Sequence, residues 1–255
     1  MKILFIGDIV GEVGRNMLSQ HLASLKHDHA IDLTIVNGEN AAHGKGITPK
    51  IAQQFKELGV DVITLGNHAF SKNVIKEKID ELDYMVRPCN MEPLGYGQGF
   101  TKLEVLGLKV MIINVCGAAF MDNIVCSPFV ATDKILANNH ADITFVDFHG
   151  EATAEKRCYF EYYKDQIQCV VGTHTHVQTA DEMISEGSCF ISDVGMCGAI
   201  ESILGRDIEE VIARSVHQQK TYFTPAKGKG MLCGVVIEVD NQTKKVVKIE
   251  RLQVK

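Results

Sequence analysis

The sequence contains 8 cysteines in 255 residues, yet no two of them form a Cys-x-x-Cys pair. Zinc ribbons and thioredoxin-like redox sites depend on that spacing, so both classes are excluded. Several of the cysteines lie inside apolar runs. This favours reduced thiols that serve as small residues of the core.

Long apolar and long basic runs are also absent. The most apolar stretch, residues 110–121, is too short to span a bilayer and contains Asn114. Met1 leads straight into a strand-like run without the features of a secretory signal. We therefore expect a soluble, cytoplasmic protein without a membrane partner. The formal net charge of −6 argues against extended nucleic-acid binding, although a single nucleotide could still occupy a pocket.

No internal repeat, low-complexity segment or Pro/Ser-rich linker divides the chain, so we expect a single domain over residues 1–255. Apolar runs at residues 2–7, 31–36 and 61–65 are typical of strands, and a helix-like segment follows each. Thr48-Pro49 is typical of a helix start, and Ser71 is expected to cap a helix that runs to about Leu82. The alternation predicts an α/β fold with a parallel sheet between helices.

The middle of the chain departs from this alternation. Residues 91–128 hold a glycine-rich loop, an antiparallel pair joined at Gly107 and an irregular stretch, so we expect a flap or subdomain there. Strands then recur at residues 143–148, 169–171 and 188–192, with helices at 151–166 and 207–219. Residues 231–239 and 246–254 alternate apolar and polar side chains around Asn241, which predicts a closing hairpin.

Polar side chains follow five of the predicted strands. The His-x-His of His174 and His176 places two imidazoles on one side of an extended chain, where they can share a metal site. Ligands gather at the carboxyl ends of the strands in parallel α/β sheets. The residues found at such ends are Asp8, Glu39, Asn40, Asn67, His68, His149, His174 and His176.

Seven of these residues are candidate metal ligands: Asp8, Glu39, Asn40, Asn67, His149, His174 and His176. Carboxylates, amides and imidazoles together suit manganese, iron or zinc better than calcium. Seven ligands are too many for one tetrahedral ion, and suit two ions that share a bridging carboxylate. Two such ions with two carboxylates and a hydroxide carry about +1 in total, which would attract a phosphodiester. His68, beside Asn67, could protonate the leaving oxygen.

Each candidate also has an ordinary structural alternative. Asp8 could cap the helix that follows it, and Asn67 could cap a turn. Glu39 and Asn40 could be loop residues in an Asx turn, and His149 could be a loop histidine. Independent surface residues, however, have no reason to select strand ends five times.

Other signals are weaker. Residues 7–14 contain three glycines but match neither Gly-x-Gly-x-x-Gly nor a P-loop. Residues 226–230 could touch phosphate, although a mobile loop is the simpler interpretation. Cys197 could act as a nucleophile, but no paired base is evident. Asn90 is a further candidate for substrate contact.

The motif series resembles that of the calcineurin-like metallophosphoesterase superfamily, and most closely its bacterial YmdB-like branch of cyclic-nucleotide phosphodiesterases. The similarity extends over essentially the whole chain. Residues 2–10 and the Asn-Gly-Glu-Asn-Ala-Ala of residues 37–42 are its most specific parts. The resemblance implies a four-layer α/β/β/α sandwich with its site at the C-terminal ends of the strands.

The resemblance also implies roles for individual residues. Asp8, Asn40 and His176 would hold a first metal, and Asn67, His149 and His174 a second. Glu39 would bridge the two ions, and His68 would be the proton donor. The implied cofactors are two divalent transition metals, iron or manganese first and zinc or magnesium as alternatives.

Three positions depart from the wider superfamily. Val10 replaces the histidine of its first motif, Glu39 replaces a bridging aspartate, and Ala69 replaces an acid after Gly-Asn-His. The first metal thus loses an imidazole, and His68 loses a partner that would orient it. The YmdB-like branch shows the same departures.

We therefore expect a phosphodiesterase that acts through a metal-bound hydroxide and His68. Its expected substrates are 2′,3′-cyclic mononucleotides, with 3′,5′-cyclic mononucleotides as further candidates. One alternative is a phosphomonoesterase or phosphoprotein phosphatase. Others are a regulatory nucleotide- or RNA-binding protein with weak turnover, and a purely structural metalloprotein. The expected partner is a small phosphodiester, and a homo-oligomer stays open.

Overall fold

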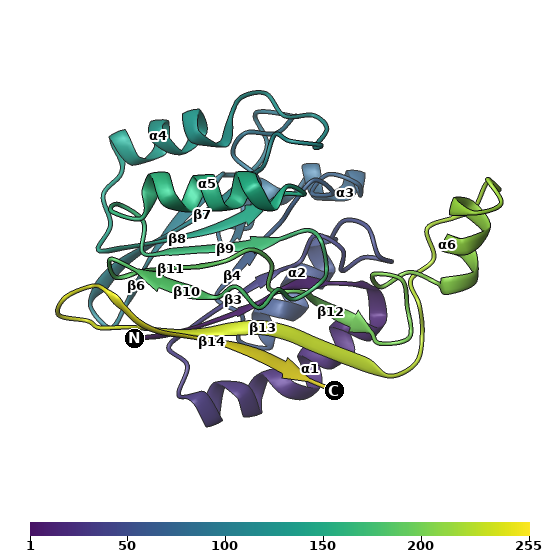
Figure 1. Cartoon of the computed structure of the whole chain (residues 1–255), viewed down its shortest axis with the longest axis horizontal. Coiled ribbons are helices and arrows are strands. Elements are labelled where there is room, and N and C mark those ends of the chain that lie inside the picture. Colours follow the sequence, from purple (N-terminus) through teal and green to yellow (C-terminus); the bar gives the residue numbers. More distant parts are fainter.

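The computed structural model describes all 255 residues, Met1–Lys255. Two sheets pack face to face, and helices cover the outer face of each sheet (Figure 1). This is the four-layer α/β/β/α arrangement expected from the sequence, and that prediction is confirmed. None of the helices combines the length and apolar character needed to cross a bilayer.

The first sheet has eight strands, and its central part is parallel. β1 (Lys2–Ile6), β3 (Leu33–Asn37), β4 (Val62–Thr64) and β5 (Met85–Val86) run in the same direction. β13 (Gly230–Val239) lies antiparallel to β1 and pairs with β14 (Val246–Val254), which confirms the closing hairpin. β12 (Met196–Ala199) joins β13 to the short strand β2 (Asp8–Ile9).

The second sheet has six strands in the order β10-β11-β9-β8-β7-β6. Its middle strands are parallel: β11 (Ser188–Ile191), β9 (Cys169–Thr173), β8 (Ile143–His149) and β7 (Leu108–Cys116). The edge strands β10 (Met183–Ser185) and β6 (Phe100–Val105) pair antiparallel with their neighbours. The β6–β7 hairpin turns at Gly107, as predicted. The turn requires a positive φ of 78° at this position, which glycine adopts without strain.

Helices α1 (Gly11–His29) and α2 (Pro49–Glu57) cover the first sheet, and α4 (Pro128–Asn138) and α5 (Thr153–Tyr163) cover the second. The hydroxyl of Thr48 accepts a hydrogen bond of 3.3 Å from the backbone N–H of Ile51, which confirms the predicted cap of α2. Strand residues alternate between two apolar layers. Leu4 and Ile6 face the helices, whereas Ile3 and Phe5 face the second sheet, where Phe5 packs on Phe145 with ring centroids 5.3 Å apart.

Two predicted helices differ in the structure. The helix expected from Ser71 to Leu82 is wrong: only α3 (Asn73–Lys76) and a 3-10 turn at Ile79–Glu81 form, and Ser71 caps neither. The chain bends between them and buries both Ile75 and Ile79 in the core. The helix predicted over residues 207–219 is shorter in the structure, where α6 comprises Ile208–Ser215. Asp207 caps it, and none of its residues is buried. It projects from the body as part of an arm (Figure 1).

Candidate metal centre

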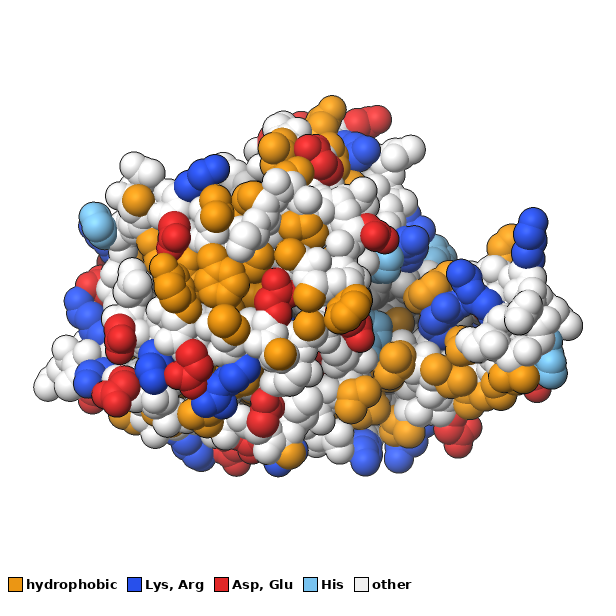
Figure 2. Space-filling model, turned by 45° about the horizontal axis from the view of Figure 1, so that its top comes forward, with side chains coloured by type: hydrophobic (Ala, Val, Ile, Leu, Met, Phe, Trp, Pro, Cys, Tyr) orange, Lys and Arg blue, Asp and Glu red, His pale blue; other side chains and the backbone are white.

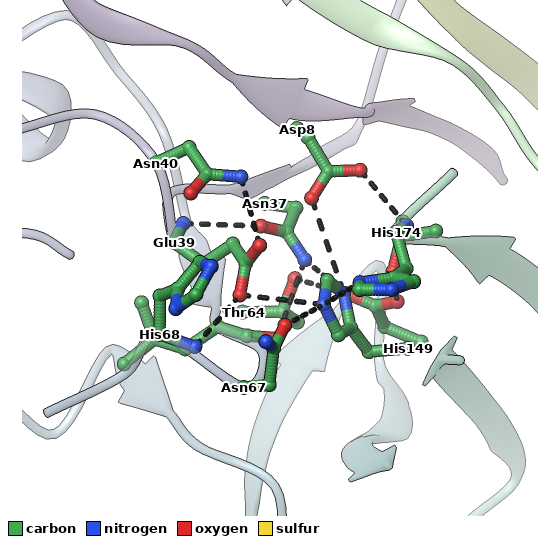
Figure 3. Close-up of polar contacts among 12 residues, drawn as sticks. Asp8, Asn37, Glu39, Asn40, Thr64, Asn67, His68, His149 and His174 are labelled. Atoms are coloured by element: carbon green, nitrogen blue, oxygen red, sulfur yellow. Dashed lines mark hydrogen bonds and ion pairs between the residues drawn. The ribbon is translucent and has the colours of Figure 1, made fainter. Parts of the chain in front are cut away.

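The carboxyl ends of the two sheets meet at one place, and the structure brings all the predicted site residues together there. Asp8 lies in β2, Glu39 and Asn40 in the turn after β3, and Asn67 and His68 in the turn after β4. The second sheet contributes His149 at the end of β8, and His174 and His176 beyond β9. Figure 3 shows side chains from both sheets pointing toward one another, among them Asp8, Glu39, Asn67, His149 and His174.

One group of ligand atoms surrounds His149. Its Nε2 atom lies 3.0 Å from Asn67 Oδ1, 3.1 Å from His174 Nδ1 and 3.3 Å from Glu39 Oε2. The ligand atoms of Glu39, His149 and His174 all lie within 4.8 Å of one another. This group could hold one metal ion.

A second group shares Glu39 with the first. Ligand atoms of Asp8, Glu39 and His176 lie within 4.8 Å of one another. The side-chain amide of Asn40 lies 2.8 Å from Glu39 Oε1 and 3.2 Å from His176 Nε2. Asp8 Oδ1 and Asn40 Oδ1 are buried without a hydrogen-bond partner. Buried acceptors of this kind are costly unless a cation or a donor satisfies them.

The three histidines each have one ring nitrogen beside a hydrogen-bond acceptor outside the cluster. His149 Nδ1 lies 2.9 Å from the Thr173 hydroxyl, whose own proton goes to Asp147 Oδ1 at 2.7 Å. His174 Nε2 lies 3.1 Å from Glu151, and His176 Nδ1 lies 2.9 Å from the carbonyl oxygen of Leu204. These contacts place the ring proton on the outer nitrogen. The nitrogen that faces the cluster therefore carries a lone pair, as a metal ligand must.

The backbone leaves room at the centre of the first group. A β-carbon on Gly66 would overlap both Glu39 Oε2 and His149 Nε2. Only glycine can occupy this position while the two side chains approach each other. The glycine of Gly66-Asn67-His68 thus keeps open the space between two candidate ligands.

Burial shifts the pKa of the ligands toward their uncharged forms. It raises the pKa of Asp8, and burial together with the charge of Asp8 raises the pKa of Glu39 well above its usual range. Burial also lowers the pKa of His149 and of His174, so both imidazoles are neutral near pH 7. The cluster has two buried carboxylates and no cation among its own side chains. Its chemistry therefore fits bound divalent metal.

His68 lies beside this cluster. Its backbone N–H donates to Glu39 Oε2 at 3.1 Å, and its imidazole lies beside the Glu39 side chain (Figure 3). Burial and then the positive charge of Lys45 lower the pKa of His68 to about 4. No side chain hydrogen-bonds its ring, and the next residue, the buried Ala69, has no polar group that could do so. The ring is therefore free to turn toward a substrate.

Cavities adjoin the cluster on two sides. One of about 350 Å³ is bordered by Asn67 and by residues of the central region, including Met91, Glu92 and Asn123. Another of about 560 Å³ is bordered by His176 and Leu204. Figure 2 shows a hollow between the body and the arm, with histidine side chains in its wall. The cluster is thus accessible from outside.

Three weaker expectations are decided by the structure. Asn90 has no free polar group to offer a substrate in this structure: it is fully buried, and its amide bonds the backbone of Cys116 and Cys126. The Cys197 thiol is no nucleophile, because it is buried, donates to the Gly14 carbonyl oxygen, and burial raises its pKa. Asp8 does not cap α1, whose N-cap is Val10 without a side-chain bond.

Val10 stands where the wider superfamily has a histidine, and here it has a packing role. Its side chain is buried against Gly198 and Gly205. Gly205 follows Leu204, whose carbonyl oxygen accepts from His176. Val10 thus supports the turn that orients the remaining imidazole of this group.

Sequence reasoning missed the residues that hold the ligands in place. These are Thr173 and Glu151, which orient His149 and His174, and the buried pair Lys156 and Asp193 behind the His-x-His loop. Asp193 had a usable signal, since it follows a predicted strand like the ligands do. Lys156 had none, because it lies in a helix between Glu155 and Arg157.

The sequence profile of the family described as YmdB-like protein matches residues 4–252. The chain belongs to the YmdB-like family. A relative from Bacillus subtilis (strain 168), named 2′,3′-cyclic-nucleotide 2′-phosphodiesterase, is 44% identical over 255 residues, which cover 99% of this chain and 96% of that protein.

Solved structures share the fold of this YmdB-like protein. The crystal structure of a novel phosphatase from Mycoplasma pneumoniae matches with a TM-score of 0.95 at 35% identity, covering 100% of this chain and 93% of that chain. A 5′-nucleotidase precursor from Thermus thermophilus matches with a TM-score of 0.56 at 13% identity, covering 100% of this chain and 54% of that chain. The latter likeness shows the fold alone.

Proposed function

We propose that this protein is a phosphodiesterase with two divalent metal ions, and that it hydrolyses cyclic nucleotides. The observation that carries the proposal is the pair of ligand groups that share Glu39. The name of the Bacillus subtilis relative supports 2′,3′-cyclic nucleotides as the substrate class, and we extend the proposal to 3′,5′-cyclic AMP. Residence in the cytoplasm stays a prediction.

Asp8, Asn40 and His176 would hold one ion, and Asn67, His149 and His174 the other, with Glu39 between them. Mixed oxygen and nitrogen ligands favour iron or manganese, with zinc and magnesium as alternatives. When bound, such ions supply positive charge for the phosphoryl oxygens and a nucleophile from water near neutral pH.

His68 would donate a proton to the leaving oxygen. It is half-buried at the edge of the cluster, and its neighbour Asn67 is a candidate ligand. A substrate phosphate held by the cluster would bring its leaving group close to this ring. Negative charge on that phosphate would favour the protonated imidazole.

The test compares two substrates with different leaving groups in wild type and His68→Ala. We expect about two metal ions per chain in both proteins. Turnover of 2′,3′-cyclic AMP should fall about 100- to 10,000-fold in His68→Ala. Turnover of bis-p-nitrophenyl phosphate should fall far less, because p-nitrophenolate leaves without a proton.

His140→Ala is the matched control, because His140 is exposed and precedes β8 at the opposite end of the sheet. It should leave both rates unchanged. Equal losses on both substrates in His68→Ala would contradict the proton-donor role. Wild-type protein without metal, even after incubation with manganese or iron, would contradict the metal centre itself.

A second candidate function is phosphomonoester hydrolysis at the same site. The name of the Mycoplasma pneumoniae structure, a novel phosphatase, favours it. Rates on p-nitrophenyl phosphate and bis-p-nitrophenyl phosphate separate the two. A higher kcat/KM on the monoester would replace our first proposal.

A further inference from the structure

Lys156 and Asp193 form an ion pair in the interior of the protein. Each side chain is only 1% exposed, and Lys156 Nζ lies 3.1 Å from Asp193 Oδ2. Lys156 extends from α5, and Asp193 follows β11. A buried ion pair seldom adds net stability over apolar residues of similar volume. Its presence therefore suggests a role other than stabilising the fold.

Both members of the pair bond the backbone of the His-x-His loop. Lys156 Nζ donates to the carbonyl oxygen of Thr173 at 2.8 Å, and Asp193 Oδ2 accepts from the N–H of Thr175 at 2.9 Å. These two backbone groups flank His174. Asp193 Oδ1 also accepts from the N–H of Gly195 at 2.9 Å, which fixes the carboxylate from the other side.

The loop so held has an unfavourable backbone conformation. His174 has a φ of 100° and His176 a φ of 67°, and few residues other than glycine adopt such angles. Strained residues persist only where their surroundings hold them. The strain is confined here to the two histidines that face the cluster.

The strand before the loop is shaped for this contact. A β-carbon on Gly172 would overlap the Ser192 carbonyl oxygen and would lie 3.0 Å from Lys156 Cδ. The N–H of Val194 donates to the carbonyl oxygen of Gly172 at 2.9 Å. Gly172 therefore lets β9, the chain around Asp193 and the stem of Lys156 approach closely behind the histidines.

We propose that Lys156 and Asp193 are positioning residues for both metal sites. Their ion pair holds Thr173 and Thr175 so that His174 and His176 point to different ions of the centre. This inference rests on the proposed metal centre, but it concerns residues that touch neither metal nor substrate. It assigns to one buried pair the alignment of both imidazoles.

The test uses Lys156→Met, Asp193→Asn and the double variant. Each protein is stripped of metal with a chelator, the chelator is removed, and the affinity for manganese is measured by titration. Lys156→Met leaves the Asp193 charge buried alone, so its melting temperature should fall. The double variant removes both charges and should recover most of that loss. Its affinity for manganese should nevertheless stay about 10- to 100-fold weaker than in wild type, because the loop lacks its charged partners.

Two control variants sharpen the result. Tyr163→Phe in α5 removes the hydroxyl that bonds Asp133 and Phe129, far from the loop, so it should lower the melting temperature without weakening manganese binding. Glu151→Ala removes the partner of His174 alone. It should weaken one of the two sites, whereas the Lys156 and Asp193 variants should weaken both.

Recovery of manganese affinity in step with the melting temperature of the double variant would overturn the proposal. So would a loss confined to one site in that variant. A wild-type protein that binds fewer than two ions would instead overturn the proposed metal centre. The two failures are distinguished because the second appears in the unmodified chain.

Discussion

The hydroxyl of Thr173 lies between two side chains of the second sheet, 2.9 Å from His149 Nδ1 and 2.7 Å from Asp147 Oδ1. A hydroxyl has one proton, and Thr173 donates it in the hydrogen bond to the carboxylate of Asp147. The oxygen of Thr173 must then accept from His149 Nδ1, which leaves His149 Nε2 with its lone pair toward the cluster.

Replacing Thr173 by valine keeps the shape of the side chain but removes this acceptor. We expect Thr173→Val to bind manganese about 10- to 100-fold more weakly, the usual effect of losing a residue that orients a ligand. Isothermal titration calorimetry of the metal-free protein with manganese measures the change in affinity. Thr173→Ser keeps the hydroxyl and should bind like wild type, and equal affinity in the valine variant would show that His149 needs no such partner.

Gly66 offers a test of space at the centre. Gly66→Ala would push a methyl group against Glu39 Oε2 and His149 Nε2, so we expect one metal ion per chain or none, in place of the two that we propose for the wild type. Elemental analysis after manganese loading gives the count. Gly95→Asn is a suitable control, because nothing lies within 4 Å of its β-carbon position and asparagine tolerates its φ of 90°. If Gly66→Ala still bound two metal ions, the ions would have to bind at another place in the protein.

The raised pKa of Glu39 makes a prediction for the metal-free protein. A carboxyl whose pKa is raised by folding stabilises the fold below its unfolded pKa, about 4.3, and this contribution is lost as pH rises through the folded value. At pH 7, above the unfolded pKa, the metal-free wild type has therefore lost stability that Glu39 supplies at low pH, whereas Glu39→Gln has no group that titrates at this position.

Glu39→Gln should melt at least about 2–4 °C above wild type in a chelator at pH 7, the shift that about 1 kcal/mol produces in a chain of this size. The difference should vanish below about pH 4. Addition of manganese should reverse the order, since the variant loses a ligand. Thermal melts across this pH range check all three statements. A metal-free wild type that melts above Glu39→Gln at pH 7 would refute the argument.

Asn90 lies outside the cluster and fastens the central region of the chain. Its amide nitrogen donates to the carbonyl oxygens of Cys116 at 2.7 Å and Cys126 at 3.1 Å, and its oxygen accepts from the N–H of Cys116 at 2.9 Å. Asn90→Ala leaves these backbone groups unpaired. We expect a loss of about 2–4 kcal/mol in the free energy of unfolding.

Denaturant melts of Asn90→Ala measure this loss. Manganese binding and turnover per folded molecule should stay near wild type, because no bond of Asn90 reaches a ligand. A selective rise of KM in a normally stable Asn90→Ala would restore the substrate role that the sequence first suggested.

Local sequence determined the strands and the residues at their ends. Apolar runs such as residues 2–6, each short and followed by a glycine or a polar residue, favour buried strands. A polar residue placed directly after such a run then lies at the carboxyl end of the strand. Thr48-Pro49 likewise encodes a helix start within a few residues. Asp8, Glu39, Asn67 and the three candidate ligand histidines were recognisable for this reason.

Tertiary structure decided what lies behind those residues. Ser71 could have begun a long helix, but burial of Ile75 and Ile79 outweighed that local preference. The burial of Lys156 and its bond to Asp193 depend on the packing of α5 against the second sheet. The two residues are 37 positions apart in the chain, and nothing in the local sequence of either one indicates the other. A strand end can be inferred from its own neighbours, whereas the partner that orients a side chain comes from a distant element and exists only once the layers have packed.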